Sequence, residues 1–287
     1  MKLSKTLSIV AVGLASVALL AACSSNANSS KSSSSKQTSI VVASDGSTSP
    51  FEYTDKSGKL TGYDVAVAKA VFAKLPQYKV TYKVVDFSSI AQGISDGRFQ
   101  MGANDFGWTA QRAQSYNFSY PISKSNDAVL VKSSAPTYKT LSDLAGKSTI
   151  GNPASNYTQV IQSFNTANPS KKINLSYSSD QTSPSTRAQQ VDSGKIDFML
   201  YDKISLTTIK EQNALDNLKV ESITDSNDSG SHAGYEYYLF GQDKTGTQLQ
   251  KDVNKELAAL QKDGTLSKLS KQYFGGDFVP TADKFKD

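Results

Sequence analysis

Short apolar segments alternate with segments of helical periodicity over most of the chain. Residues 39–44 form a β-branched run typical of a strand, whereas residues 63–75 repeat apolar side chains at helical spacing until Pro76. Further strands are predicted at residues 51–53, 79–85, 99–103, 127–132, 148–151, 173–177, 195–200 and 235–240, and further helices at 87–94, 141–146, 157–164, 185–191, 203–210, 247–260 and 267–274. This alternation indicates an α/β fold with a mainly parallel sheet covered by helices on both faces.

The N-terminal residues have the pattern of a targeting segment. Lys2 and Lys5 precede an apolar stretch at residues 7–20, and a Leu-Ala-Ala sequence then leads into Cys23. A small-residue cleavage site directly before a cysteine resembles the lipobox of bacterial lipoproteins. We therefore expect a signal peptide at residues 1–22 and a lipid anchor on Cys23 that holds the protein at a membrane surface.

The composition after this segment indicates a globular body on a tether. Residues 23–38 are rich in serine, which predicts a flexible tether. The remainder is long enough for one large domain or for two lobes with separate cores. The net charge of +5 is mild, and no basic stripe indicates a nucleic-acid partner. Cys23 is the only cysteine, so we expect neither a disulfide framework nor a cysteine metal site.

The segment around Arg112 has the pattern of an anion-binding site. Asn104, Asp105 and Gly107 provide turn chemistry at the carboxyl end of a short apolar strand. Thr109 can then cap a short helix that holds Arg112. The planar guanidinium of an arginine can bind a carboxylate with two parallel hydrogen bonds, while nearby backbone N–H groups share the anion. We therefore expect Arg112 to bind a carboxylate.

The second half of the chain repeats the order of the first half and ends a strand at Asp202. In open parallel sheets, ligands bind outside the carboxyl ends of the strands. Arg112 and Asp202 both lie at such ends, one in each half. A cation from one half and an anion from the other, facing a common cleft, match a zwitterionic solute.

Three motifs are similar to those of the extracellular solute-binding proteins of polar amino-acid uptake, which have the periplasmic-binding type II fold. Four shorter matches resemble the cystine-binding branch of that family. The family motifs are Pro50-Phe51 with the Gly-Lys-Leu-Thr-Gly-Tyr-Asp of residues 58–64, Thr109-Ala110-Gln111-Arg112 with the Phe-Ser-Tyr-Pro of 118–121, and the Asp-Gly-Thr-Leu of 263–266 with Phe274-Gly275; the branch matches are Ala103-Asn104, Ser155-Asn156-Tyr157, Tyr201-Asp202 and residues 263–270.

The resemblance implies a role for each candidate residue. Arg112 binds the α-carboxylate of the solute, helped by Ser155 and Asn156 at a helix start. Asp202 binds the α-ammonium, helped by the backbone around Asn104, Asp105 and Gly107. The remaining candidates are Asp45, which faces polar groups farther out, Phe51 and Phe87, which form the walls of the side-chain pocket, and Trp108, which lies at the cleft rim or anchors the two lobes.

The resemblance also implies how the molecule is organised and what it does. Lobe I comprises residues 39–127 with 236–287 and lobe II residues 128–235, and the chain crosses between them twice. The lobes close on L-cystine, and the closed receptor delivers it to the permease and ATPase of an ABC importer. We expect a monomer on the extracellular face of the bacterial cytoplasmic membrane, in a Gram-positive setting, without a cofactor, a metal or a catalytic residue.

Several alternatives remain open at this point. Asp105 stands where cystine binders are expected to have Gln and Thr48 where an aromatic residue is common, so the solute is alternatively glutamate, glutamine or a basic amino acid. Other possibilities are a surface adhesin and an enzyme on the same fold, although His232 is the only histidine and no nucleophile elbow accompanies it. The simpler interpretations of single residues are a structural ion pair for Arg112, helix capping for Asp202, Ser155 and Asn156, core packing for Phe51 and Phe87, and turn formation for Asp45.

Overall fold

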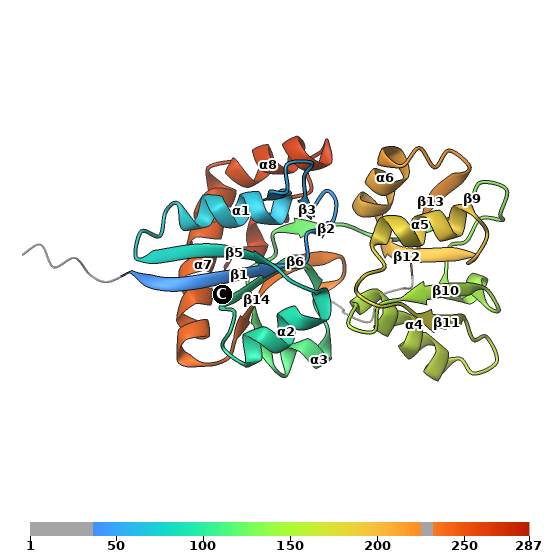
Figure 1. Ribbon diagram of the computed structural model, residues 1–287, viewed down its shortest axis with the longest axis horizontal. Helices are drawn as coiled ribbons and strands as arrows, with labels where there is room; N and C mark the ends of the chain where they lie inside the picture. Colours follow the sequence, from blue (N-terminus) through green and yellow to red (C-terminus); the bar gives the residue numbers. More distant parts are fainter. Residues whose placement is uncertain (1–36, 225–231, 287) are drawn as a thin grey trace, which may run out of the picture. The chain divides into compact units, whose positions relative to one another are not determined.

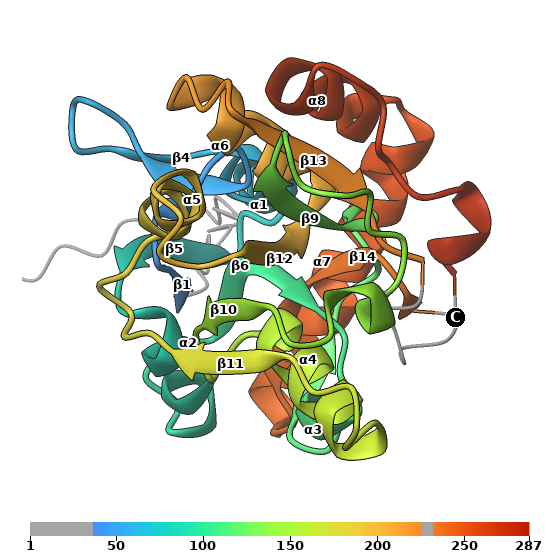
Figure 2. The same cartoon turned by 90° about the vertical axis from the view of Figure 1, so that its right-hand side faces the viewer.

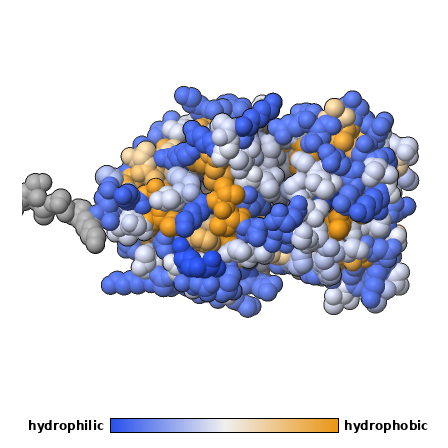
Figure 3. Space-filling view, viewed as in Figure 1, coloured by the Kyte–Doolittle hydropathy of each residue, from blue (hydrophilic) through white to orange (hydrophobic). Residues whose placement is uncertain are grey.

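The computed structural model describes residues 37–224 and 232–286. The predicted signal peptide 1–22, the predicted anchor Cys23 and all but the last two residues of the predicted tether 23–38 lie outside the described residues. Within the described part, no helix combines the length and the hydropathy that a bilayer-spanning helix needs. On the face that Figure 3 shows, hydrophilic side chains predominate and apolar ones form separate small groups.

A six-stranded sheet lies at the centre of the larger core (Figure 1). Its strand order is β5-β1-β6-β14-β7, with β8 paired to β14. The first three strands are parallel, and β14 pairs antiparallel with β6, β7 and β8. The strands are β1 (Thr38–Ser44), β5 (Tyr78–Val84), β6 (Met101–Gly107), β7 (Tyr116–Phe118), β8 (Ser123–Lys124) and β14 (Tyr235–Gly241).

Helices cover both faces of this sheet, because successive residues of its strands point to opposite sides. In β1, Val42 packs into the core under α1, α7 and α8, while its neighbour Ala43 packs into the core under α2. The elements of this part are α1 (Tyr63–Phe72), α2 (Phe87–Ser95), α3 (Ala110–Ala113), α7 (Lys244–Lys262), α8 (Thr265–Phe274) and η3 (Ala282–Lys284), with a small antiparallel sheet of β2 (Ser47–Thr48), β3 (Glu52–Thr54) and β4 (Leu60–Thr61).

A second core is built from residues 128–223. It contains an antiparallel sheet of order β12-β9-β13 and a parallel pair β10-β11 (Figure 2). The elements are β9 (Asp127–Lys132), η1 (Leu141–Leu144), β10 (Ser148–Gly151), α4 (Asn156–Ala167), β11 (Asn174–Tyr177), α5 (Pro184–Asp192), β12 (Phe198–Asp202), α6 (Lys203–Gln212) and β13 (Leu218–Ser222). The α/β fold class predicted from the sequence is therefore confirmed.

We use lobe I for the part built on the six-stranded sheet and lobe II for the part built on the second core. The chain passes from lobe I to lobe II before β9 and returns at β14. At the crossings, the backbone N–H of Ser125 donates to the carbonyl of Gly234 at 2.8 Å. The described residues nevertheless form one compact unit, so the division into 39–127 with 236–287 and 128–235 stays a prediction.

The structure differs from the predicted elements at several places, including the short strands β2, β4, β7 and β8, which had not been predicted. Asn104, Asp105 and Gly107 were predicted to form a turn but belong to β6, because β14 pairs with the end of this strand. Asp105 departs from regular strand geometry with a φ of 47°. Strand β12 begins at Phe198 rather than at residue 195, and β13, which had not been predicted, pairs with β9.

Candidate functional site

Arg112 lies at the boundary of the two lobes and contacts both. Thr109 caps α3, as predicted, and its hydroxyl accepts from the backbone N–H of Arg112 at 3.1 Å. The guanidinium donates to the carbonyl of Gly107 at 2.7 Å and to that of Ala154, in lobe II, at 2.9 Å. It also lies over the ring of Phe106, 5.1 Å from the centroid. Burial lowers the pKa of Arg112 to about 10, so the side chain keeps its charge at neutral pH.

Asp202 divides two functions between its two carboxylate oxygens. Its Oδ1 caps α6 by accepting from the backbone N–H of Ser205 at 2.8 Å, and it accepts from the hydroxyl of Ser125 at 3.3 Å. Its Oδ2 is buried and has no hydrogen-bond partner. Burial raises the pKa of Asp202 to about 6. The capping interpretation therefore describes one oxygen, and the other stays available to a cation.

Further buried carboxylates surround Asp202. Asp105 and Glu236 are 5% and 3% exposed and lie within hydrogen-bond reach of each other, and no other group of the described residues donates to the two oxygens of Asp105. Burial, followed by the repulsion of neighbouring carboxylates, raises the pKa of both residues well above the usual range. Asp64 accepts from the backbone N–H of Asp105 at 2.8 Å, and Glu52 is fully buried.

These carboxylates suit an organic cation. Among the described residues, no group of three or more His, Cys, Asp or Glu side chains has an arrangement that could hold a metal ion. Buried carboxylates that repel one another are stabilised by any cation that enters between them. An ammonium group, which donates three hydrogen bonds, meets both the charge and the unpaired acceptors.

The start of α4 brings three predicted residues together. Ser155 occupies the N-cap position without a side-chain capping bond, and Asn156 is the first residue of the helix. Across the boundary, a Cβ on Gly107 would lie 2.7 Å from the Asn156 side-chain nitrogen. Gly107 therefore permits the close approach of the two lobes. On the lobe I side, the Asn104 side-chain oxygen accepts from the backbone N–H of Asp45 at 2.5 Å.

Two cavities lie on either side of Asn156 and Tyr157, which line both. The smaller one has a volume of about 30 Å³, close to the volume that one water molecule occupies in the liquid. The larger one has a volume of about 540 Å³ and follows α4. Six predicted residues line the smaller cavity, namely Asp45, Phe87, Asn104, Asp105, Ser155 and Asn156, and three line the larger one, namely Gly107, Trp108 and Asn156.

Arg112, Asp202 and Phe51 line neither cavity. Phe51 is fully buried in the lobe I core, where its ring lies 4.7 Å from that of Phe274. The structure therefore does not bring Phe51 to the cleft, because α8 supplies an aromatic partner on the core side. Trp108 lies at the larger cavity and stacks on His232 with a centroid distance of 4.6 Å and an angle of 10°.

Sequence reasoning missed several charged or aromatic residues of the site. Arg187 lines the smaller cavity, and it follows Pro184 by three positions on the buried face of α5. Glu236 interrupts the apolar run of a central strand. A charge at a position where the periodicity expects an apolar side chain was the available signal in both cases. Thr48 and Tyr201 were both noted through the family resemblance, but the approach of their hydroxyls to 3.5 Å across the lobe boundary was not predicted.

Comparisons with known proteins show which family the chain resembles. The probable amino-acid-binding protein YxeM of Bacillus subtilis is 32% identical over 264 residues, which cover 91% of this chain and 94% of the relative. The L-cystine-binding protein TcyA of the same species is 31% identical and covers 83% of this chain and 82% of its own. A solved structure from a study of glutathione import in Gram-positive bacteria via GshT and the cystine ABC importer TcyBC of Streptococcus mutans is 35% identical, covers 86% of this chain and 99% of its own, and has a TM-score of 0.80.

The family comparison extends over most of the described residues. Residues 40–276 match the bacterial extracellular solute-binding proteins, family 3. Members of this family bind a substrate and do not transform it, so the prediction that the protein is not an enzyme is confirmed. The resemblance to the receptors of polar amino-acid ABC transporters is confirmed as well. The chain belongs to family 3 of the bacterial extracellular solute-binding proteins.

Proposed function

We propose that this protein captures L-cystine for an ABC importer. The observation that carries the proposal is that each lobe contributes one unpaired buried charge: Arg112, which forms no ion pair among the described residues, and Asp202, whose Oδ2 has no hydrogen-bond partner among them. An α-carboxylate and an α-ammonium are the groups that these two side chains bind best. The names of several relatives, TcyA among them, support cystine as the amino acid.

Binding requires the lobes to separate and close again. The smaller cavity, at about 30 Å³, is far below the roughly 300–1,000 Å³ of small-molecule sites. The larger one, at about 540 Å³, is lined by neither Arg112 nor Asp202. A solute that contacts both of these residues therefore enters when lobe I and lobe II move apart. The carboxylate then takes the place of the Gly107 and Ala154 carbonyls on Arg112. A solute that contacts both lobes stabilises the closed state by its differential affinity for that state.

Glutathione is a second candidate. The solved structure from the study of glutathione import via GshT is 35% identical to this chain with a TM-score of 0.80. The glutamyl end of glutathione carries an α-carboxylate and an α-ammonium, so it presents the same groups to Arg112 and Asp202 as an amino acid does. The two candidates differ at the far end of the solute.

A ligand panel tests the proposal. The purified protein is unfolded in denaturant, washed and refolded to remove bound solutes, and its melting temperature is measured with L-cystine, glutathione, glutamate, glutamine and arginine. A ligand at about 100 times its Kd stabilises the fold by about 2.7 kcal/mol. We expect the largest increase with L-cystine. If the melting temperature rose only with another solute, that solute would replace cystine as the proposed ligand. If it rose with none of them, the proposal that the protein binds these solutes would be rejected.

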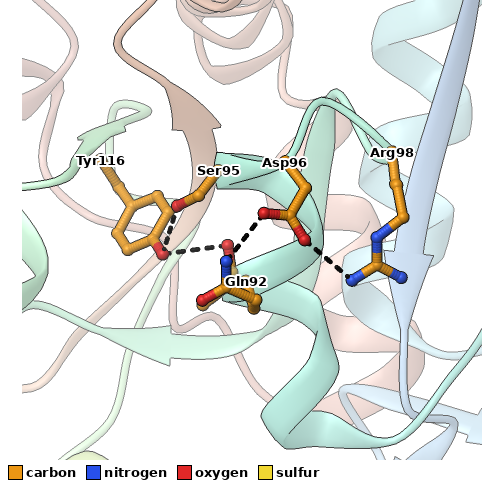
Figure 4. Close-up of polar contacts among 6 residues, drawn as sticks. Gln92, Ser95, Asp96, Arg98 and Tyr116 are labelled. Atoms are coloured by element: carbon orange, nitrogen blue, oxygen red, sulfur yellow. Dashed lines mark hydrogen bonds and ion pairs between the residues drawn. The ribbon is translucent and has the colours of Figure 1, made fainter.

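Substitution of Arg112 tests the site itself. We expect Arg112→Ala to weaken the affinity for the best ligand at least about a hundredfold, because one partner of a buried charge pair is lost. Titration calorimetry measures this. The control is Arg98→Ala, since Arg98 is half exposed, forms an ion pair with Asp96 at 3.4 Å after the end of α2 (Figure 4), lies over the ring of Phe99 and lines neither cavity. Unchanged affinity in the Arg112 variant would remove this residue from the site.

We further propose that the protein is a monomeric lipoprotein on the extracellular face of the cytoplasmic membrane of a Gram-positive bacterium. What supports this is the small-small-Cys pattern that ends at Cys23, together with a family whose members are extracellular. The closed receptor is recognised by a permease that an ATPase drives. Mass spectrometry of the N-terminal peptide from membranes is expected to show a diacylglyceryl group on Cys23, and Cys23→Ala is expected to release the protein into the medium.

A further inference from the structure

Arg187 is a second buried arginine, and it lines a cavity between the lobes. The proposed binding of one amino-acid head group by Arg112 and Asp202 gives Arg187 no role. It lies on α5 in lobe II and is only 6% exposed. Among the described residues it forms no ion pair, and its Nε has no hydrogen-bond partner. Its guanidinium lies over the ring of Tyr201, 5.4 Å from the centroid, and it lines the smaller cavity. A buried cation without a carboxylate partner is costly unless an anion joins it.

Asp45 faces the same cavity from lobe I. It follows β1, and its Oδ1 accepts from the backbone N–H of Ser47 at 2.8 Å. Burial lowers the pKa of Arg187, and the negative charge of Asp45 opposes this by favouring the charged form, but the two side chains form no ion pair. Asp180 also lines this cavity, but its two oxygens accept from Ser88 and Asn152. Asp105 lines the cavity as well, but the charges that act most on it are those of Glu236 and Asp202, whereas Asp45 is the aspartate that acts on Arg187. Asp45 is therefore the carboxylate that can accept a cation beside Arg187.

We propose that Arg187 and Asp45 form a distal subsite that binds a second carboxylate, and beside it a second ammonium, at the far end of the solute. The inference rests on the proposed function and extends it, because it selects a solute with two carboxylates over ordinary amino acids. Arg112 and Asp202 bind one head group, and Arg187 and Asp45 bind the other. Each pair takes its arginine and its aspartate from opposite lobes, so both pairs complete their contacts only when the cleft closes.

L-cystine and glutathione both carry a second carboxylate at the far end of the molecule, and Asp45 distinguishes them. L-cystine has an amino-acid head group at each end, so its far end carries both a carboxylate and an ammonium. Reduced glutathione, bound by its glutamyl end, presents only the glycine carboxylate at the far end. Asp45→Asn is therefore expected to weaken the binding of L-cystine and to leave that of glutathione nearly unchanged.

The decisive measurement compares ligands that have one and two carboxylates. Calorimetry is carried out with L-cystine, reduced glutathione and S-methyl-L-cysteine, which keeps one head group and the sulfur but lacks the far end. We expect Arg187→Gln to weaken the affinity for L-cystine at least about 30-fold, because one partner of a buried charge pair is lost. The affinity for S-methyl-L-cysteine is expected to change less than about threefold. Arg187→Lys keeps the positive charge but loses the planar guanidinium, so its affinity for L-cystine is expected to lie between those of the wild type and Arg187→Gln.

The outcomes separate this inference from the proposed function. The half-exposed Arg98 again serves as the control, as Arg98→Gln, and melting of the ligand-free variants checks folding. An equal loss for all three ligands would make Arg187 a structural residue, and no loss for L-cystine would remove it from the site; either result overturns the inference while amino-acid binding stands. If the wild-type protein bound none of the ligands, the proposed function would fail and the distal subsite with it.

Discussion

At the scale of single residues, burial rather than ion pairing has the largest effect on the pKa values of the charged groups in the cleft. Arg112 donates to backbone carbonyls, Arg187 lies over an aromatic ring, and Asp202 uses one oxygen for a helix cap. None of the three forms an ion pair in the described part of the chain. The cost of burying these charges is offset when a zwitterion supplies the missing partners.

Asp202 offers a direct test, because capping and ligand binding reside on different oxygens. Asparagine caps helices as well as aspartate does, so Asp202→Asn is expected to change the melting temperature little. The same substitution removes the charge and is expected to weaken amino-acid binding at least about 30-fold at pH 7.5. The control is Asp243→Asn, since Asp243 caps α7 by accepting from Gly246 at 2.9 Å and lies at neither cavity. A variant that binds like the wild type would restrict Asp202 to capping.

The same residue predicts how binding depends on pH. Burial raises the pKa of Asp202 to about 6, and an ammonium binds only the ionised form. Protonation therefore competes with the ligand as the pH falls through about 6, and the affinity of the wild-type protein is expected to decrease between pH 7.5 and 5.5. The head groups of an amino acid do not titrate in this range, so Asp202→Asn should show a flatter profile in calorimetry. Affinity that rises toward low pH would contradict the assignment.

At the scale of elements, a loop of lobe II caps a helix of lobe I. Asp180, between β11 and α5, accepts from the hydroxyl of Ser88 at 2.6 Å and from its backbone N–H at 3.2 Å. Ser88 lies in the first turn of α2, where backbone N–H groups lack helical partners and favour a negative charge. Gln181 adds a bond to Asp86 at 3.2 Å. These contacts exist only while the lobes are together.

Removal of this cap is expected to favour the open state. Asp180→Ala eliminates charge-assisted hydrogen bonds worth about 1–2 kcal/mol in total, so the ligand should dissociate roughly tenfold faster, which stopped-flow tryptophan fluorescence can follow through Trp108. Asp55→Ala is the matched control, because Asp55 also accepts from a nearby serine, Ser57, but within a turn of lobe I. Equal dissociation rates for the two variants would show that the cap does not hold the lobes.

How far the sequence predicts this molecule depends on whether a feature is local. The α/β alternation and the cap of α3 by Thr109 follow from patterns within a few residues, and both are confirmed. The bond from Arg112 to Ala154 joins residues 42 positions apart, and no local pattern indicates it. Arg187 and Glu236 did leave a local signal, a charge at a buried position of their element, but the sequence does not show which groups of the other lobe lie beside that charge. Phe51 was expected at the wall of the pocket, but it lies in the lobe I core, where Phe274 of α8 packs against its ring.

At the scale of the whole molecule, Ser125 connects the two crossings between the lobes to Asp202 through hydrogen bonds. Gly234 has a φ of 72°, and a Cβ there would lie 2.2 Å from the carbonyl oxygen of Ser125 on the other crossing. The hydroxyl of Ser125 in turn donates to Asp202 at 3.3 Å. A displacement at the crossings therefore reaches the carboxylate that binds the ammonium.

Gly234→Ala tests whether this contact couples the crossings to binding. The substitution adds a clash with backbone to the strain of a left-handed conformation, so we expect it to destabilise the fold by at least about 2 kcal/mol and to weaken ligand binding about tenfold through Ser125. Gly194→Ala separates the two effects, because Gly194 has a similar φ of 76° but open space around the added carbon. That control should cost only about 1–2 kcal/mol, from the left-handed strain alone, and leave the affinity unchanged. Because strain alone affects both variants equally, a weaker affinity in both, or in neither, would mean that closure does not depend on the contact between Ser125 and Gly234.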